Sequence, residues 1–239
     1  MTETALSESG APAGPPTRRF FRSDPSVLLL VATVVVAVAV APFELSTAFG
    51  LPAHALFLHV PVVLVPILAG VVIALAVRPV WRVRYGLAAG VFAIVTMAAT
   101  VLTAGAGEKL RDERMARMKQ FGGGAARAPQ GGGARAPQGG GGEGSLLDRH
   151  AELGSQLRLL VALLTLLLVV LVILARYQAA TSEGLLARPV IVTAVAAVTV
   201  VVAIVSAIWV VRTGHLGAEM TWHVGGEGPS GGAPRPGSP

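Results

Sequence analysis

The sequence predicts an all-α fold: a polytopic transmembrane helix bundle with a four-helix core and one N-terminal span. Two observations carry this prediction. The 239 residues are 53% hydrophobic and only 13% charged, whereas soluble globular chains carry about 25% charged residues. Five apolar stretches lack any charged residue, His, Asn or Gln, and about 20 such residues suffice to cross the hydrocarbon as a helix. A chain this poor in charge is not a soluble enzyme.

In chain order, the spans are separated by tails and loops of contrasting composition. Residues 1–25 are predicted to be a disordered cytoplasmic tail, followed by an N-terminal span or signal anchor at 26–43. The four-helix membrane domain covers 51–224, with spans at about 55–77, 86–104, 157–176 and 189–211. A low-complexity extracytoplasmic loop at 122–144 contains a tandem glycine-rich octapeptide, and a disordered tail covers 225–239.

The first span has two interpretations. The segment Thr17-Arg18-Arg19-Phe20-Phe21 before an apolar run resembles a twin-arginine signal peptide. Pro42 directly follows the small residues that end this run and disfavours cleavage there, and the leader is long. We therefore prefer an uncleaved anchor. Both interpretations place the next segment outside the cell.

Arginine placement predicts the orientation of the bundle in the cell membrane. Arginines precede the first span, occupy the short loop 78–84 and flank the loop between the last two spans, whereas the short loop 44–53 has no Lys or Arg. The N-terminus is therefore predicted in the cytoplasm and the C-terminus outside. The long loop 104–156 carries many Lys and Arg together with acidic residues, but long loops determine topology weakly.

Polar chemistry gathers at one level of the predicted bundle. The five apolar stretches contain no ionisable residue, which weighs against ion pumps and proton-coupled transporters. Measured along each helix from its cytoplasmic arginine, one layer at roughly 36–40 Å receives His54, Glu108, His150, Glu152 and His215. His59 lies just below this layer, and His223 follows in the tail. With a hydrocarbon core about 30 Å thick, the layer falls at the outer membrane boundary.

This histidine layer predicts a cofactor site, because imidazole is the usual ligand for haem iron and for Zn, Cu or Fe in a chain without cysteine. The candidate cofactor-binding residues are His54, His59, His150 and His215, with Glu108 and Glu152 orienting them through hydrogen bonds. Alternatively, a more hydrated site in the same layer would bind a transition metal through His54, His150, His215 and Glu219. The last two share a helical face only if the helix continues past Gly214 and Gly217. The sequence does not choose between b-type haem and a metal.

Four short motifs in this layer resemble a known family. Residues Pro52-Ala53-His54-Ala55-Leu56-Phe57-Leu58-His59-Val60-Pro61 have the pattern H-x4-H-x-P, and TAGAGE ending at Glu108, RHAELG from Arg149 and TGHLGAEM from Thr213 follow it. Their order and spacing over about 51–224 are similar to Domain of Unknown Function 2231, a bacterial and archaeal four-helix membrane domain. That family often has glycine where this chain has Ala218, and its loop is usually shorter. The resemblance implies the fold and makes the histidines and glutamates of these motifs candidates, but it implies no reaction.

The predicted function is an electron-transfer or metal-handling subunit in the lipid bilayer, working with a redox or membrane-complex partner. A cofactor-free accessory or scaffold protein is the alternative, and a carrier for a small neutral solute is a third. No catalytic residue is predicted, since no Ser or Thr stands with His and Asp in nucleophile spacing. The 19 Lys and Arg outnumber the 13 Asp and Glu, but they form no basic stripe with interleaved aromatics, so nucleic acid is not a predicted partner.

Overall fold

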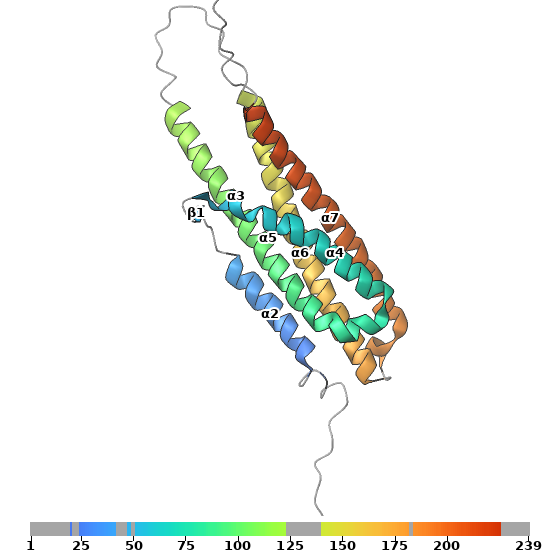
Figure 1. Ribbon diagram of the computed structural model, residues 1–239. Helices are drawn as coiled ribbons and strands as arrows, with labels where there is room; N and C mark the ends of the chain where they lie inside the picture. The colour runs from blue at the N-terminus through green and yellow to red at the C-terminus, as the bar shows by residue number, and fades with distance from the viewer. Residues whose placement is uncertain are drawn as a thin grey trace, which may run out of the picture.

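Four helices that are long and apolar enough to cross a membrane form the centre of the protein (Figure 1). They are α4 (His59–Val77), α5 (Pro79–Gly122), α6 (Gly140–Ala180) and α7 (Pro189–Gly225). The computed structural model describes residues 20, 24–41, 47–48, 51–122, 140–181 and 184–225. The all-α prediction is confirmed, since the described part adds only two-residue strands, β1 (Thr47–Ala48) and β2 (Leu51–Pro52), to the helices.

Three of the central helices are much longer than their predicted spans. The helix α5 continues to Gly122 and α7 continues through Gly214 and Gly217 to Gly225, so the condition for a shared His215–Glu219 face is met. The helix α6 begins at Gly140, inside the predicted loop 122–144. Most of that loop, the tail 226–239, the arginine pair before the first span and Pro42 lie outside the described residues.

The connection between α4 and α5 is a single residue, Arg78, so the predicted loop 78–84 is wrong. Pro79 opens α5, where its missing N–H costs nothing and its fixed φ suits a first helical residue. The guanidinium of Arg82 then reaches back to the end of α4, with Nε donating to Leu75 O at 2.8 Å and Nη2 to Ala76 O at 2.6 Å. A cation at these unpaired terminal carbonyls is favourable, and it closes the turn.

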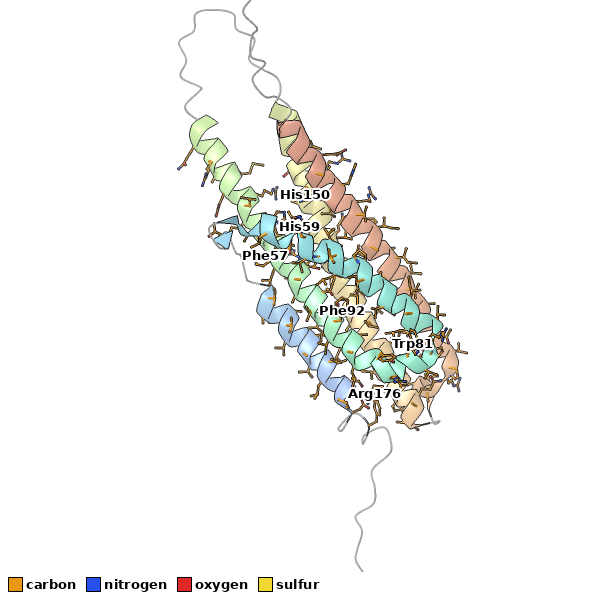
Figure 2. The ribbon with its side chains drawn as sticks, in the orientation of Figure 1. Phe57, His59, Trp81, Phe92, His150 and Arg176 are labelled. Atoms are coloured by element: carbon orange, nitrogen blue, oxygen red, sulfur yellow. The ribbon has the colours of Figure 1, made fainter. Side chains whose placement is uncertain are left out.

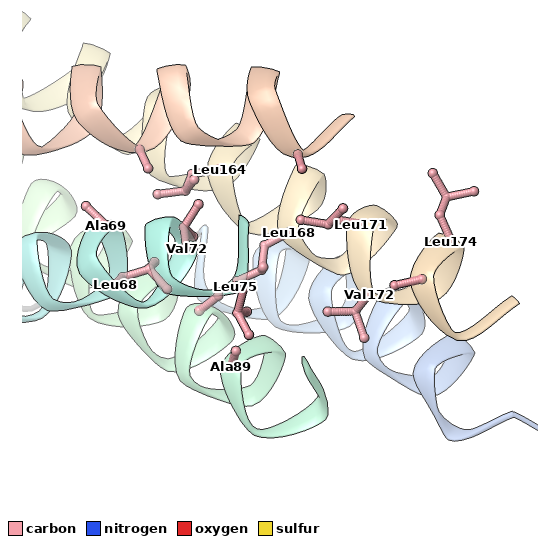
Figure 3. Close-up of a cluster of buried hydrophobic side chains, with 14 of the residues drawn as sticks. Leu68, Ala69, Val72, Leu75, Ala89, Leu164, Leu168, Leu171, Val172 and Leu174 are labelled. Carbon is pink, nitrogen blue, oxygen red and sulfur yellow. The ribbon is translucent and has the colours of Figure 1, made fainter. Parts of the chain in front are cut away.

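The core lies where α4, α5, α6 and α7 face one another, and Figure 3 shows part of it. Leu68, Val72, Leu164 and Leu168 are completely buried there. Buried hydroxyl groups in the apolar segments donate to the carbonyl four residues earlier, as Thr165 does to Val161 O at 2.9 Å. These groups are therefore satisfied without water, which a lipid-embedded bundle requires.

The N-terminal helix α2 (Pro25–Val40) packs on α5 and α6 as a fifth element. Its 16 residues extend about 24 Å, which is shorter than a hydrocarbon core of about 30 Å. Gly86 and Gly90, four residues apart on α5, let neighbouring helices approach closely: a Cβ on Gly86 would meet Val172 of α6 at 3.0 Å, and one on Gly90 would meet Leu29 of α2 at 2.5 Å. Small residues at this spacing are typical of helix–helix contacts in membranes.

A partly buried ion pair fixes the start of α2. Asp24 caps the helix by accepting a hydrogen bond from Ser26 N at 2.8 Å, and it pairs with Arg176 of α6 at 2.9 Å. The two side chains are only 13% and 21% exposed. Burial raises the pKa of Asp24, but the hydrogen bonds from Arg176 and Ser26 outweigh it and hold this pKa below its ordinary value.

A histidine cavity at one end of the bundle

Histidines gather at one end of the bundle, and Figure 2 shows His59 and His150 there, with Trp81 and Arg176 at the other end. We call these the histidine end and the arginine end. At the histidine end the span predicted at 55–77 is broken into α3 (Ala53–Phe57) and α4, with Leu58 between them. Pro61 explains the break, because it has no N–H to donate to the carbonyl four residues earlier, that of Phe57.

The carbonyl that Pro61 leaves free is met by a side chain of α5. The hydroxyl of Thr103 lies 3.2 Å from Phe57 O and 2.8 Å from Ala99 O in its own helix, and it donates toward both. The backbone carbonyl of the same residue is 3.0 Å from Nδ1 of His54. Thr103 therefore joins α5 to α3 through two of its polar groups.

His54 is oriented by this contact. A carbonyl oxygen only accepts hydrogen bonds, so the contact with Thr103 O places the proton on Nδ1 and leaves Nε2 with a free lone pair. Metal-ligating histidines show this arrangement, with one ring nitrogen donating to a carbonyl and the other free to coordinate. The ring packs on Gly107 of α5, where a Cβ would lie 2.9 Å from Cε1 and Nδ1. Only glycine at 107 leaves His54 in this position.

His150 of α6 is the neighbour of His54. The two ring centroids are 6.0 Å apart and the ring planes make an angle of 87°. The Nδ1 atom of His150 is buried and has no hydrogen-bond partner among the described residues, and a buried polar atom left unpaired is costly. On its other side the ring faces Gly217 of α7, where a Cβ would lie 3.2 Å from Cε1. Two imidazoles from two helices are thus seated against glycines of two others.

Both rings line a cavity of about 450 Å³ at the histidine end. Its walls come from α3, α4, α5, α6 and α7 and are mostly apolar, with Leu58, Val62, Leu157 and Val210 among them. His59, Glu108 and Arg111 also line it. The cavity is concave and apolar with a few convergent polar groups, as small-molecule and cofactor sites usually are.

The remaining candidate residues occupy several places around this cavity. His59 lines it but is largely exposed. His215 is 77% exposed, does not line the cavity and pairs with Glu219 at 3.5 Å. Glu108 pairs with Arg158 at 3.4 Å, and Glu152 accepts a hydrogen bond from Gln156 at 3.2 Å. Among the described residues, no three His, Cys, Asp or Glu come close enough to hold a metal ion together. The structure therefore brings together His54 and His150, and separates His215 and Glu219 from them.

Three residues that seat the histidines were not found from the sequence as parts of a site: Thr103, Gly107 and Gly217. All three lie within the short motifs TAGAGE and TGHLGAEM, which were recognised as patterns around Glu108 and His215. The two glycines are informative because each faces a bulky imidazole of a neighbouring helix. That relation is known only once the neighbouring helix has been placed.

No family model, no curated protein and no solved structure matches this chain. The class of this protein therefore rests on its helices. Four long helices with mean hydropathy between 2.1 and 3.1 in their most apolar segments define a multi-pass helical membrane protein.

Proposed function

We propose that this protein is a membrane subunit that binds b-type haem at the histidine end and carries electrons, with His54 and His150 as the ligating residues. The observation that carries the proposal is this histidine pair, with a free lone pair on one ring and a buried unpartnered nitrogen on the other. Membership of the Domain of Unknown Function 2231 family, with its motif histidines at these positions, belongs to the same proposal.

The number of protein ligands favours haem over Zn or Cu. Zinc sites in proteins use three or four side-chain ligands, and the described residues offer no such group. Haem iron takes only one or two axial ligands from the protein, and histidine is the commonest. The mostly apolar walls of the cavity also suit a macrocycle, since an apolar, water-poor site is one means by which proteins set the potential of an iron centre.

The bound group would supply one-electron chemistry, and the chain would hold and tune it. Thr103 O keeps the His54 ring in one tautomer and one orientation. Gly107 and Gly217 allow the two imidazoles to approach the helices of the opposite wall. Leu58, Val62 and Leu157 give the cavity apolar walls. Of the charged residues that line the cavity, Arg111 pairs with Asp148 and Glu108 pairs with Arg158, so these two add little net charge.

The test is a reduced-minus-oxidised absorption spectrum of detergent-purified protein produced with haem supplied, with elemental analysis of the same sample. We expect Soret, α and β bands in the wild type, and their loss in His54→Ala and His150→Ala. The matched control is His215→Ala, which removes an exposed imidazole outside the cavity and retains the bands. Equal bands in all three variants, or no bands in the wild type, would refute the proposal, and stoichiometric Cu or Zn would replace haem with a metal.

The second candidate is a cofactor-free scaffold, and one observation favours it. Side chains already tie the helices together at the histidine end: Arg111 pairs with Asp148 at 2.6 Å, and Trp209 Nε1 donates to Gln156 Oε1 at 2.9 Å. In this reading the two imidazoles pack edge to face for stability alone. His54→Ala would then lower the thermal midpoint equally in protein prepared with and without haem. A loss confined to haem-supplied protein speaks for the cofactor.

A further inference from the structure

The arginine end contains a second, smaller cavity, of about 280 Å³, between the first turns of α5 and the last turns of α6. Val80 and Val83 of α5 and Ala175, Gln178 and Ala179 of α6 line it, together with Arg82. This cavity lies at the opposite end of the bundle from the histidine cavity and is independent of the proposed haem site.

Arg82 is a buried charge without an acidic partner. The residue is 6% exposed, and none of the ion pairs among the described residues includes it. Its two hydrogen bonds go to the neutral carbonyls of Leu75 and Ala76, whereas a guanidinium carries five N–H groups. The partial negative charge at a helix end offsets only about half of a unit charge. A buried cation that keeps free donors beside a cavity is suited to an anion.

The surroundings of the cavity match the headgroup level of a membrane. Arg78 lies 5.4 Å above the ring of Trp81, and Arg84 lies 5.3 Å from the ring of Tyr85. Trp81 and Tyr85 are exposed residues, at 39% and 46%. Interfacial Trp and Tyr mark the membrane–water boundary, and basic pockets between helices at that level bind anionic headgroups.

We propose that this cavity binds a phosphate group, held by the guanidinium of Arg82. The phosphate comes from the headgroup of an anionic lipid or from free phosphate. The exposed apolar side chain of Val80, at 77%, and that of Val83 border the cavity and give acyl chains a surface to lie on.

The test compares the thermal midpoint of the full chain in neutral detergent with added phosphatidylglycerol, with added phosphatidylcholine, or with inorganic phosphate against chloride at equal ionic strength. Phosphatidylglycerol is expected to raise the midpoint by about 3 °C or more over phosphatidylcholine. Arg82→Gln should lose this gain, and the matched control Arg84→Gln, which removes an exposed arginine two residues away, should keep it.

Because Arg82 also closes the α4–α5 turn, a second variant keeps the arginine and fills the cavity. Ala179→Leu is expected to leave the midpoint in phosphatidylcholine unchanged and to abolish the gain with phosphatidylglycerol. A gain with inorganic phosphate as well identifies free phosphate as a ligand, and a gain with the lipid alone identifies the headgroup. No gain in the wild type, or an equal gain in Arg82→Gln and Ala179→Leu, overturns the proposal.

Discussion

Replacing Gly107 by alanine tests how tightly the His54 ring is held. The new methyl group would lie 2.9 Å from Cε1 and Nδ1 of that ring, so the ring must move away and its 3.0 Å contact with Thr103 O must lengthen. Overpacking costs about 1–3 kcal/mol and the lost hydrogen bond about 1 kcal/mol. The better helix propensity of alanine returns about 1 kcal/mol. The net expectation is a destabilisation of about 1–3 kcal/mol.

The matched control is Gly154→Ala. Gly154 is also helical and also lines the cavity, but a Cβ there meets nothing within 4 Å. This variant should gain up to about 1 kcal/mol from helix propensity alone. Thermal unfolding in detergent, followed by circular dichroism, should therefore show a midpoint lowered by about 3–9 °C for Gly107→Ala and unchanged or raised for Gly154→Ala. Shifts of equal size and sign in both variants would refute the view that the ring is seated against Gly107.

Two further predictions concern buried polar contacts. Asp24→Asn breaks the ion pair with Arg176 and should cost about 1–3 kcal/mol of stability at pH 7, seen as a lower thermal midpoint. Because the folded-state pKa of Asp24 is lowered, its stabilisation is present above the unfolded value of about 3.9 and is lost as the pH falls through the folded pKa. Thr103→Val removes the hydroxyl that meets Phe57 O and should cost about 1 kcal/mol, whereas Thr103→Ser should be close to wild type.

The outcomes that contradict these predictions are specific. If the midpoints of wild type and Asp24→Asn fall in parallel between pH 5 and pH 2, Asp24 does not contribute the expected acid sensitivity. If Thr103→Val is as stable as the wild type while Thr103→Ser is destabilised, the methyl packing of Thr103 and not its hydroxyl holds α5 to α3.

Hydropathy predicted the four central helices because a membrane span depends on composition over many residues and tolerates errors at its ends. The position of the histidines along the helix axes also followed from the sequence, since the rise per residue is nearly constant. His54, His59, Glu108 and His150 do line one cavity. The direction in which each side chain leaves its helix could not be predicted from the sequence. His215 lies at the same predicted height as His150, yet its side chain is 77% exposed. That direction is set by packing against neighbours, which hydropathy does not encode.

The sequence also could not predict which backbone carbonyls accept hydrogen bonds from these side chains. The partners of Arg82 are the carbonyls of Leu75 and Ala76, and the partner of His54 is the carbonyl of Thr103. Every residue type carries such a carbonyl, so the sequence gives no sign of which one a side chain will meet. The contact of Arg82 with the end of α4 was hidden for this reason, and the polar residues at 78–84 predicted a loop. The structure has a single connecting residue there, Arg78.

The meeting of Pro61 and Thr103 at the carbonyl of Phe57 makes these two positions interdependent. An alanine at 61 would return an N–H to that carbonyl, and the hydroxyl at 103 would then be dispensable there. The cost of Thr103→Val should accordingly shrink in a Pro61→Ala background, so the two substitutions are non-additive. A substitution at one of these positions would change which residues are stable at the other. Sequences that descend from this one should therefore vary at 61 and 103 together.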